Sequence, residues 1–244
     1  MRERVEILGV PIDVLTMGEA LEKIQGFIAQ GTPHQVVTAN AEMVMLAQED
    51  REFSELLAGA HLVTGDGAGV VWASKKTGKP LPERVTGVDL VNNLLPVAAR
   101  EGYGIFLFGA APGVAAEAGE MMKEKFPALK IVGVENGYFQ VQDEQTIVEK
   151  IRAAQPQILL VALGFPRQEK WIQKNLHNLG VPVAIGVGGT LDVFSGKVLR
   201  APVWMQKSNL EWLYRLLKEP QRAVRMLALP KFVLRVLGNT RKRG

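Results

Sequence analysis

An aspartate between two glycines is the residue of this sequence best suited to do chemistry. Asp66 directly follows the apolar run Leu62–Val63, flanked by Gly65 and Gly67. A carboxylate placed there could take the proton of a sugar hydroxyl as a general base. It could equally cap the helix expected to follow. Position alone leaves both interpretations open.

Four more polar residues stand where a ligand could be bound. Thr38 and Asn40 follow the run Val36–Val37 and suit either helix capping or contact with a sugar. Arg84 and Asp89 belong to the string Arg-Val-Thr-Gly-Val-Asp. They could act on a substrate or form a plain surface ion pair.

Three polar residues follow Pro166 in the first turn of a predicted helix: Arg167, Gln168 and Glu169. They could cap a solvated helix, but Gln and Arg beside a glycine also suit a phosphate or a sugar. The histidines are expected to be structural: His34, His61 and His177.

Glycines follow five of the six apolar runs. They permit close approach of a ligand to the backbone and leave helix N-terminal amides open to an anion. The sequence therefore predicts a phosphate-bearing ligand. No Walker A or dinucleotide signature is present, and the chain has no cysteine and no D-x-D pair. We therefore expect no metal site and no cofactor, with a diphosphate stabilised by helix N-termini and by Arg or Lys.

The elements that must position these residues alternate along the chain. Six β-rich runs are separated by helical stretches: Gln35–Thr38, His61–Thr64, Ile105–Phe108, Lys130–Val134, Ile158–Leu163 and Val183–Val187. Several are apolar throughout, as in parallel strands buried on both faces. We predict a Rossmann-like, mostly parallel sheet flanked by helices, with ligands at the carboxyl ends of its strands.

Charge divides the chain of 244 residues into two parts. Residues 195–244 carry a balance of +10, which leaves −6 for residues 1–194. We predict an α/β catalytic domain at 1–195 and a basic amphipathic helical appendage at 196–244 that docks on an anionic membrane. The alternatives are a solvated helical subdomain and a nucleic-acid-binding tail. Because the tail's aromatic residues are interspersed with Leu and Met, it suits lipid better than stacked bases.

The N-terminal residues are charged and then alternate, without the long apolar core of a signal peptide. The longest stretch without a charged residue, 24–41, contains too many polar residues for a membrane span. The expected location is cytoplasmic, peripherally attached to the cytoplasmic face of the membrane.

Eight strings together carry a resemblance to a known family. They are Thr-Ala-Asn-Ala-Glu-Met (38–43), Gly-Asp-Gly-Ala-Gly-Val-Val-Trp (65–72), Arg-Val-Thr-Gly-Val-Asp (84–89), Leu-Phe-Gly-Ala-Ala-Pro-Gly (107–113), Asn-Gly-Tyr-Phe (136–139), Ala-Leu-Gly-Phe-Pro-Arg-Gln-Glu-Lys-Trp (162–171), Gly-Val-Gly-Gly-Thr-Leu-Asp-Val-Phe-Ser-Gly (186–196) and Arg-Ala-Pro-Val-Trp-Met-Gln (200–206). In this order the sequence resembles the WecG/TagA/CpsF glycosyltransferases, family 26, over nearly its whole length.

The resemblance implies a metal-independent inverting transfer of N-acetylmannosamine from a UDP donor to undecaprenyl-diphosphate-linked N-acetylglucosamine. The β-1,4 disaccharide lipid is the linkage unit of wall teichoic acid in the TagA branch, which we favour; in the WecG branch the donor is the uronic acid form. A non-catalytic nucleotide-sugar-binding module is the remaining alternative. Nucleic acid is not an expected partner, and a homo-oligomer is left open.

The resemblance also implies roles for individual residues. Asp66 would be the base for the acceptor C4 hydroxyl, with Arg84 positioning substrate or stabilising charge. Thr38 and Asn40 would hold the donor sugar, and Gln168 would orient a sugar. The implied substrate contacts, UDP contacts among them, are Gly109, Gly137, Tyr138, Gly164, Arg167, Gly188, Gly189 and Asp192. Cations of the appendage could approach either diphosphate: Arg215, Arg222 and Arg225.

Overall fold

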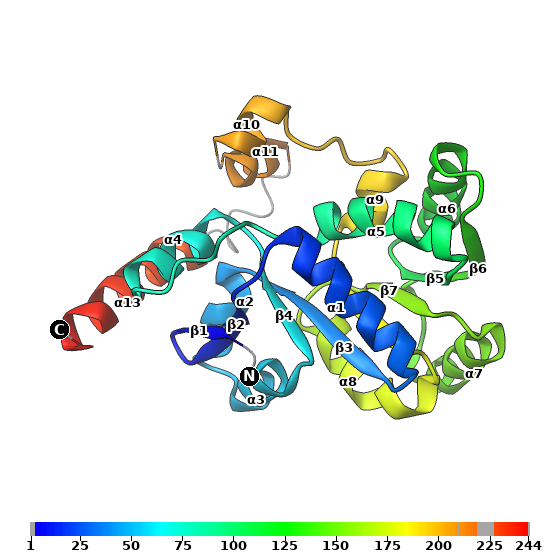
Figure 1. Ribbon diagram of the computed structural model, residues 1–244, viewed down its shortest axis with the longest axis horizontal. Helices are drawn as coiled ribbons and strands as arrows, with labels where there is room; N and C mark the ends of the chain where they lie inside the picture. Colours follow the sequence, from blue (N-terminus) through cyan, green and yellow to red (C-terminus); the bar gives the residue numbers. More distant parts are fainter. Residues whose placement is uncertain (1–2, 209, 219–226, 244) are drawn as a thin grey trace.

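The computed structural model describes residues 3–208, 210–218 and 227–243 (Figure 1). In this part of the chain, six parallel strands form one sheet in the order β4-β3-β8-β7-β5-β6. The strands are β3 (His34–Ala39), β4 (Leu62–Gly65), β5 (Gly104–Gly109), β6 (Lys130–Glu135), β7 (Ile158–Ala162) and β8 (Val183–Gly186). All six predicted strands and the parallel α/β class are confirmed.

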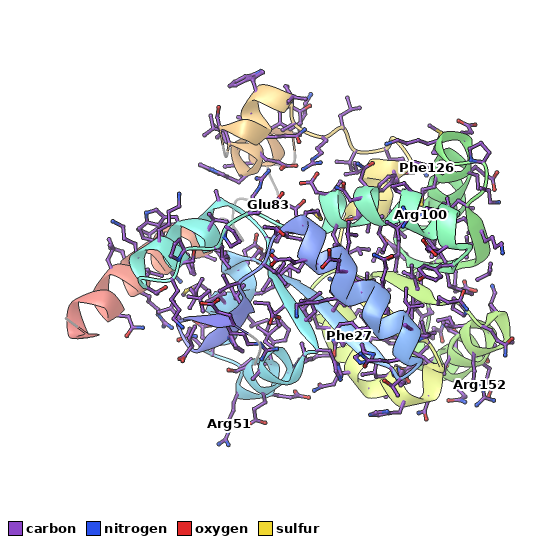
Figure 2. The ribbon with its side chains drawn as sticks, viewed as in Figure 1. Phe27, Arg51, Glu83, Arg100, Phe126 and Arg152 are labelled. Atoms are coloured by element: carbon purple, nitrogen blue, oxygen red, sulfur yellow. The ribbon has the colours of Figure 1, made fainter. Side chains whose placement is uncertain are left out.

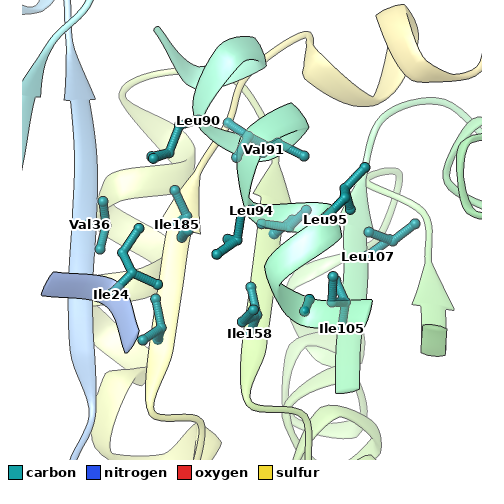
Figure 3. Close-up of a cluster of buried hydrophobic side chains, with 14 of the residues drawn as sticks. Ile24, Val36, Leu90, Val91, Leu94, Leu95, Ile105, Leu107, Ile158 and Ile185 are labelled. Atoms are coloured by element: carbon teal, nitrogen blue, oxygen red, sulfur yellow. The ribbon is translucent and has the colours of Figure 1, made fainter. Parts of the chain in front are cut away.

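One face of the sheet is covered by three long helices and a short one. They are α1 (Met17–Gln30), α5 (Gly87–Glu101), α6 (Val114–Lys125) and α9 (Thr190–Phe194). Figure 3 shows the core between them, where Ile24 of α1 and Leu94 of α5 lie over Val36, Ile158 and Ile185 of the strands. Since side chains alternate across a strand, every second strand residue faces this core.

Two cores lie on the opposite face. Over β5, β7 and β8, the helices α7 (Glu144–Ala154) and α8 (Arg167–Leu179) cover Phe106, Phe108 and Leu159. A short 3₁₀ turn, η1 (Val141–Asp143), precedes α7. Over β3 and β4, the covering elements are α2 (Ala41–Leu46), α3 (Arg51–Gly59), α4 (Ala68–Lys76) and an antiparallel hairpin of β1 (Arg4–Ile7) and β2 (Val10–Asp13).

The first helix, α1, is capped at both ends by residues adjacent to it in the sequence. Thr16 accepts a hydrogen bond from the Glu19 backbone N–H at 3.3 Å, and the Glu19 carboxylate accepts one from the Thr16 N–H at 2.7 Å. This reciprocal pair is a capping box. Gly31 ends the helix in the left-handed conformation, with φ at 70°. Gly31 therefore ends α1 three residues before β3 begins at His34.

The C-terminal part contributes three described helices, α10 (Val203–Lys207), α11 (Glu211–Lys218) and α13 (Ala228–Arg243). Helices α10 and α11 lie at the top of Figure 1, whereas α13 lies beside α4. Phe232 and Val236 of α13 are buried in the same core as the hairpin, α2 and α4. Gly69 of α4 lies against the Phe232 ring, since a Cβ added there would be 3.6 Å from it, in ordinary van der Waals contact. The predicted appendage thus shares a core with the body through α13.

None of the helices in the described ranges is both long and apolar enough to span a bilayer.

Candidate active site

A cavity of about 290 Å³ opens at the carboxyl ends of β3, β4, β7 and β8. Its walls come from the loops after these strands, from the start of α5 and from α11, which lies over it. The sequence-predicted residues that line it are Thr38, Asn40, Asp66, Arg84, Gly164, Gln168, Gly188 and Gly189. The edge of the sheet expected to bind a ligand therefore does hold a cavity, with a carboxylate, a guanidinium and two amides around it.

Asp66 is half-buried and held from one side by a helix start. One of its carboxylate oxygens accepts a hydrogen bond from the backbone N–H of Gly87 at 3.1 Å, the first residue of α5. The N-cap of α4 is Gly67, with no side-chain cap. The interpretation of Asp66 as the cap of the following helix is therefore wrong. Its carboxylate is instead bound to the first residue of α5, which also lines the cavity.

The sequence left open whether Thr38 and Asn40 cap helices or contact a sugar, and the structure shows that only Asn40 is a cap. Asn40 caps α2, because its Oδ1 accepts a hydrogen bond from the Met43 N–H at 2.9 Å. Its amide nitrogen is not used in that cap. Thr38 caps no helix: it is buried at the end of β3 and its hydroxyl lies 3.4 Å from the Gly186 carbonyl. Both residues line the cavity.

Both the oxygen and the nitrogen of the Gln168 side-chain amide form hydrogen bonds within the protein. Its Oε1 accepts from the Gly188 N–H at 3.0 Å, and its Nε2 donates to Glu169 Oε1 at 2.7 Å. A Cβ at Gly186 would lie 2.8 Å from both the Gln168 nitrogen and the Glu169 oxygen, so only glycine fits there. The amide of Gln168 therefore has one defined orientation in the cavity wall.

Glu169 is fully buried behind Gln168. Burial raises the pKa of its carboxyl from 4.5 to about 7. Among the described residues its Oε2 has no hydrogen-bond partner. Instead of capping a solvated helix, as one interpretation had it, this carboxyl stands inside the protein against the residue that lines the site.

Arg84 and Asp89 do not form the ion pair that their shared string suggested. Asp89 binds Arg200 with both oxygens, one of them at 2.9 Å. Arg84 lies 3.7 Å from a carboxylate oxygen of Glu211, the first residue of α11. Burial raises the pKa of Asp89, but hydrogen bonds from Arg200 and Thr86 outweigh it and bring that pKa below its ordinary value.

A second group of predicted residues gathers beside the cavity, at the ends of β5, β6 and β7. Arg167 donates to the Gly137 carbonyl at 3.3 Å and lies over the ring of Phe139. Gly109 has φ at 121°, and a Cβ there would meet the Ala162 carbonyl at 2.4 Å. Tyr138 is 75% exposed. These residues do not line the cavity itself.

The chain path favours ligand binding beside this second group. Helix α6, which follows β5, covers one face of the sheet, whereas α8, which follows β7, covers the other. The neighbouring strands β5 and β7 therefore send the chain to opposite faces. Open α/β sheets bind ligands next to such a switch point.

The remaining predicted residues lie on α9 and in the C-terminal part. Asp192 of α9 is close to Gly189, whose added Cβ would be 3.7 Å from the carboxylate. Arg215 belongs to α11, between the cavity-lining residues Trp212 and Leu216, and its side chain is not described. Arg222 and Arg225 lie outside the described residues.

Sequence reasoning missed several residues of this site. Glu42 and Thr190 line the cavity from α2 and α9, and Glu211, Trp212 and Leu216 line it from α11. Arg200 begins one of the strings that carry the family resemblance (200–206), but no role was expected for it. In the described ranges, no three His, Cys, Asp or Glu side chains come together as metal ligands.

Comparison with known proteins adds a family and named relatives. Residues 5–244 match the model of the glycosyl transferase WecG/TagA/CpsF family. A protein of Bacillus spizizenii (strain W23) is 43% identical over 206 residues, which cover 84% of this chain and 79% of the relative. One of Bacillus subtilis (strain 168) is 40% identical over 86% of this chain and 82% of its own. A third, of Staphylococcus aureus (strain MW2), is 35% identical over 98% and 94%. All three are named N-acetylglucosaminyldiphosphoundecaprenol N-acetyl-beta-D-mannosaminyltransferase.

Proposed function

Because the chain belongs to the WecG/TagA/CpsF family of glycosyl transferases, we propose that it makes a disaccharide lipid. The donor is UDP-N-acetylmannosamine and the acceptor is N-acetylglucosaminyl-diphosphoundecaprenol. The product is β-1,4-linked and serves as the linkage unit of wall teichoic acid. The observation that carries the proposal is the cavity that brings Asp66, Arg84 and Gln168 together at the ends of the strands.

The reaction is a displacement with inversion at the anomeric carbon. The acceptor C4 oxygen forms the new bond to that carbon while the bond to the UDP oxygen breaks, and UDP leaves with the electron pair. Asp66 takes the hydroxyl proton in this step and later releases it to water. Its anchoring to the Gly87 N–H supports this role, because it fixes the direction of the carboxylate.

The other residues around the cavity bind and orient the two substrates. Thr38 and Asn40 hold the donor sugar, and the fixed amide of Gln168 orients it. Arg84 stabilises the negative charge that grows on the leaving diphosphate. The UDP moiety extends from the cavity towards Gly109, Gly137 and Tyr138, which lie at the ends of β5 and β6.

Product analysis tests this function. The enzyme is incubated with UDP-N-acetylmannosamine and a short polyprenyl-diphosphate-N-acetylglucosamine, and the lipid is analysed by mass spectrometry and linkage analysis. We expect the β-1,4 disaccharide lipid and free UDP. Transfer from the uronic acid donor alone would replace the donor proposed here. Binding of UDP-sugar without transfer from either donor would make the chain a binding module instead.

We further propose that residues 196–244 attach the enzyme to the anionic cytoplasmic face of the membrane. Large apolar side chains are exposed on all three described helices of this part: Val203, Trp204, Trp212, Leu217, Val233, Leu234 and Leu237. Lys231 and Arg235 of α13 are exposed among them. Each basic residue near an anionic surface contributes about 1 kcal/mol. Apolar and cationic groups side by side suit a peripheral contact with lipid.

Vesicle binding tests the attachment. The pair Lys231→Gln and Arg235→Gln should weaken binding to vesicles that contain an anionic phospholipid, yet spare turnover of a soluble acceptor analogue. The matched control is Lys130→Gln with Arg152→Gln, which removes the same charge near the opposite edge of the sheet, where β6 lies; Figure 2 shows Arg152 on α7, far from α13. Equal binding by the two double variants would contradict the proposal.

A further inference from the structure

A network of four charged side chains joins the C-terminal part to the wall of the cavity. Arg200 stands at its centre and binds both oxygens of Asp89, at the start of α5. Its Nε also donates to Glu211 at 3.0 Å, at the start of α11. The second oxygen of Glu211 lies 3.7 Å from Arg84. Two carboxylates thus alternate with two guanidinium groups.

These groups are shielded from water. The side chains of Arg200 and Arg84 are each 19% exposed, that of Glu211 is 13% exposed, and that of Asp89 is 30% exposed. Removing one member would leave its partner charged and poorly solvated. A network of this kind has a definite geometry, because the guanidinium fork of Arg200 fits two carboxylates at once.

The network reaches two parts of the site that the proposed reaction uses. Asp89 also contacts Thr86, the N-cap of α5: its carboxylate accepts from the Thr86 hydroxyl at 2.7 Å, and its backbone N–H donates to that hydroxyl oxygen at 3.1 Å. The next residue, Gly87, donates its N–H to Asp66. On the other side, Glu211 faces Arg84, and the following turn of α11 brings Trp212 and Leu216 over the cavity.

We propose that Arg200 is a positioning residue for the transfer reaction: it fastens α11 over the cavity and fixes the start of α5 against Asp66. Arg200 touches no reacting atom in this role. It acts through Asp89 on the base and through Glu211 on Arg84. The kinetic consequences of this inference rest on the proposed function. The attachment of α11 to the start of α5 through Arg200 does not depend on which sugar is transferred.

The matched control lies three residues away on the same segment. Lys197 forms an ion pair with Glu117 of α6 at 2.9 Å, with both side chains about half exposed. Lys197→Ala therefore removes one cation and one link between this segment and the body. It leaves the Arg200 network intact.

The first measurement is the kinetics of Arg200→Ala. We expect kcat/KM for the acceptor to fall by about 10- to 100-fold, the scale of a misplacement near 1 Å. The acceptor KM should rise, which a mere loss of folded enzyme would not cause. Lys197→Ala should stay within about twofold of the wild type, as expected where an exposed ion pair contributes little. Equal kinetics of the two variants would overturn the proposal.

A double-mutant cycle identifies the partner through which Arg200 acts. Asp89→Asn alone should reduce turnover, and its combination with Arg200→Ala should cost no more than the worse single variant. Losses that multiply would contradict a shared role. If Arg200→Ala does not fold, Arg200→Lys takes its place: one ammonium group cannot bind Asp89 and Glu211 in the fork geometry, so turnover should still fall. Wild-type turnover in the lysine variant would overturn the proposal.

Hydrogen exchange tests the fastening without any substrate. The amides of Glu211–Lys218 should exchange faster in Arg200→Ala than in the wild type, and at the wild-type rate in Lys197→Ala. Unchanged exchange in both variants would overturn the proposal. If the wild-type enzyme forms no disaccharide lipid, the proposed function fails, and this comparison still decides the role of Arg200.

Discussion

The carboxylate of Asp66 accepts a hydrogen bond from the backbone N–H of Gly87, 21 residues later in the chain, at 3.1 Å. This contact joins two parts of the cavity wall, the end of β4 and the start of α5. Gly87 also lies close to Thr38, because a Cβ added to Gly87 would be 3.3 Å from the Thr38 hydroxyl. The candidate base and a candidate sugar contact therefore both lie against the same helix start.

The first prediction concerns Asp66 itself. In Asp66→Asn the amide oxygen can still accept from Gly87, so the fold and the affinity for UDP should survive. Turnover should fall by about 10²- to 10⁴-fold, because the amide cannot take a proton. Initial rates and calorimetric titration with UDP measure the two effects. The control is Asp50→Asn, which changes the cap of α3 and should leave turnover unchanged. Near-normal turnover in Asp66→Asn would exclude it as the base.

The second prediction is that transfer needs no divalent metal ion. The sequence has no cysteine and no D-x-D pair, and we expect cations such as Arg84 to neutralise the diphosphate. Rates in excess EDTA should equal those in added Mg²⁺ or Mn²⁺. A loss of activity in EDTA that Mg²⁺ or Mn²⁺ alone restores would show that a metal ion stabilises the leaving group.

The sequence predicted the sheet well because of how its strands are buried. Strands such as β5 and β7 contact cores on both faces, so each reads as a continuous apolar run. The hairpin of β1 and β2 was not predicted. Its four-residue strands are held by contacts distant in sequence, since buried Asp13 accepts from the Val63 N–H at 2.7 Å and Arg4 donates to the Ala60 carbonyl at 3.0 Å. Short strands of this kind carry too weak a local pattern.

The same distinction explains the site. Thr38, Asp66 and Gln168 were predicted because each follows a strand, and parallel strands end at one edge. Glu211 and Trp212 were missed because their place depends on an ion pair between Arg200 and Asp89, 111 residues apart. No periodicity in a single sequence indicates such a pairing. The burial of Glu169 was missed for a related reason: a glutamate in a first helical turn is ordinarily solvated.

The third prediction follows from that burial. Between about pH 4.5 and 7 the unfolded chain loses the Glu169 proton while the folded protein keeps it. The folded state binds more protons there, so the free energy of unfolding falls as pH rises, by about 3 kcal/mol in all. Glu169→Gln keeps the acceptor for Gln168 and removes the ionisation. Urea unfolding at pH 5 and pH 8 should therefore show a smaller difference in this variant than in the wild type.

Exposed Glu149 of α7 supplies the control for this measurement. Glu149→Gln should keep the wild-type dependence of stability on pH, since its carboxylate is solvated in both states. If Glu169→Gln and the wild type lost the same stability between pH 5 and pH 8, the buried carboxyl would not be the titrating group.

The last prediction concerns the two faces of α13. Phe232 is fully buried against α2 and α4, whereas Leu234, two residues on, is 71% exposed. Phe232→Ala should lower the free energy of unfolding by about 3–5 kcal/mol, the usual cost of removing a buried aromatic ring. Leu234→Ala should change it by less than about 0.5 kcal/mol but weaken binding to anionic vesicles, because its side chain lies on the face proposed to contact lipid. Urea unfolding and vesicle co-sedimentation of both variants measure the contrast. Equal losses of stability would mean that α13 does not pack on the body in solution, and unchanged vesicle binding by Leu234→Ala would remove this face from the membrane contact.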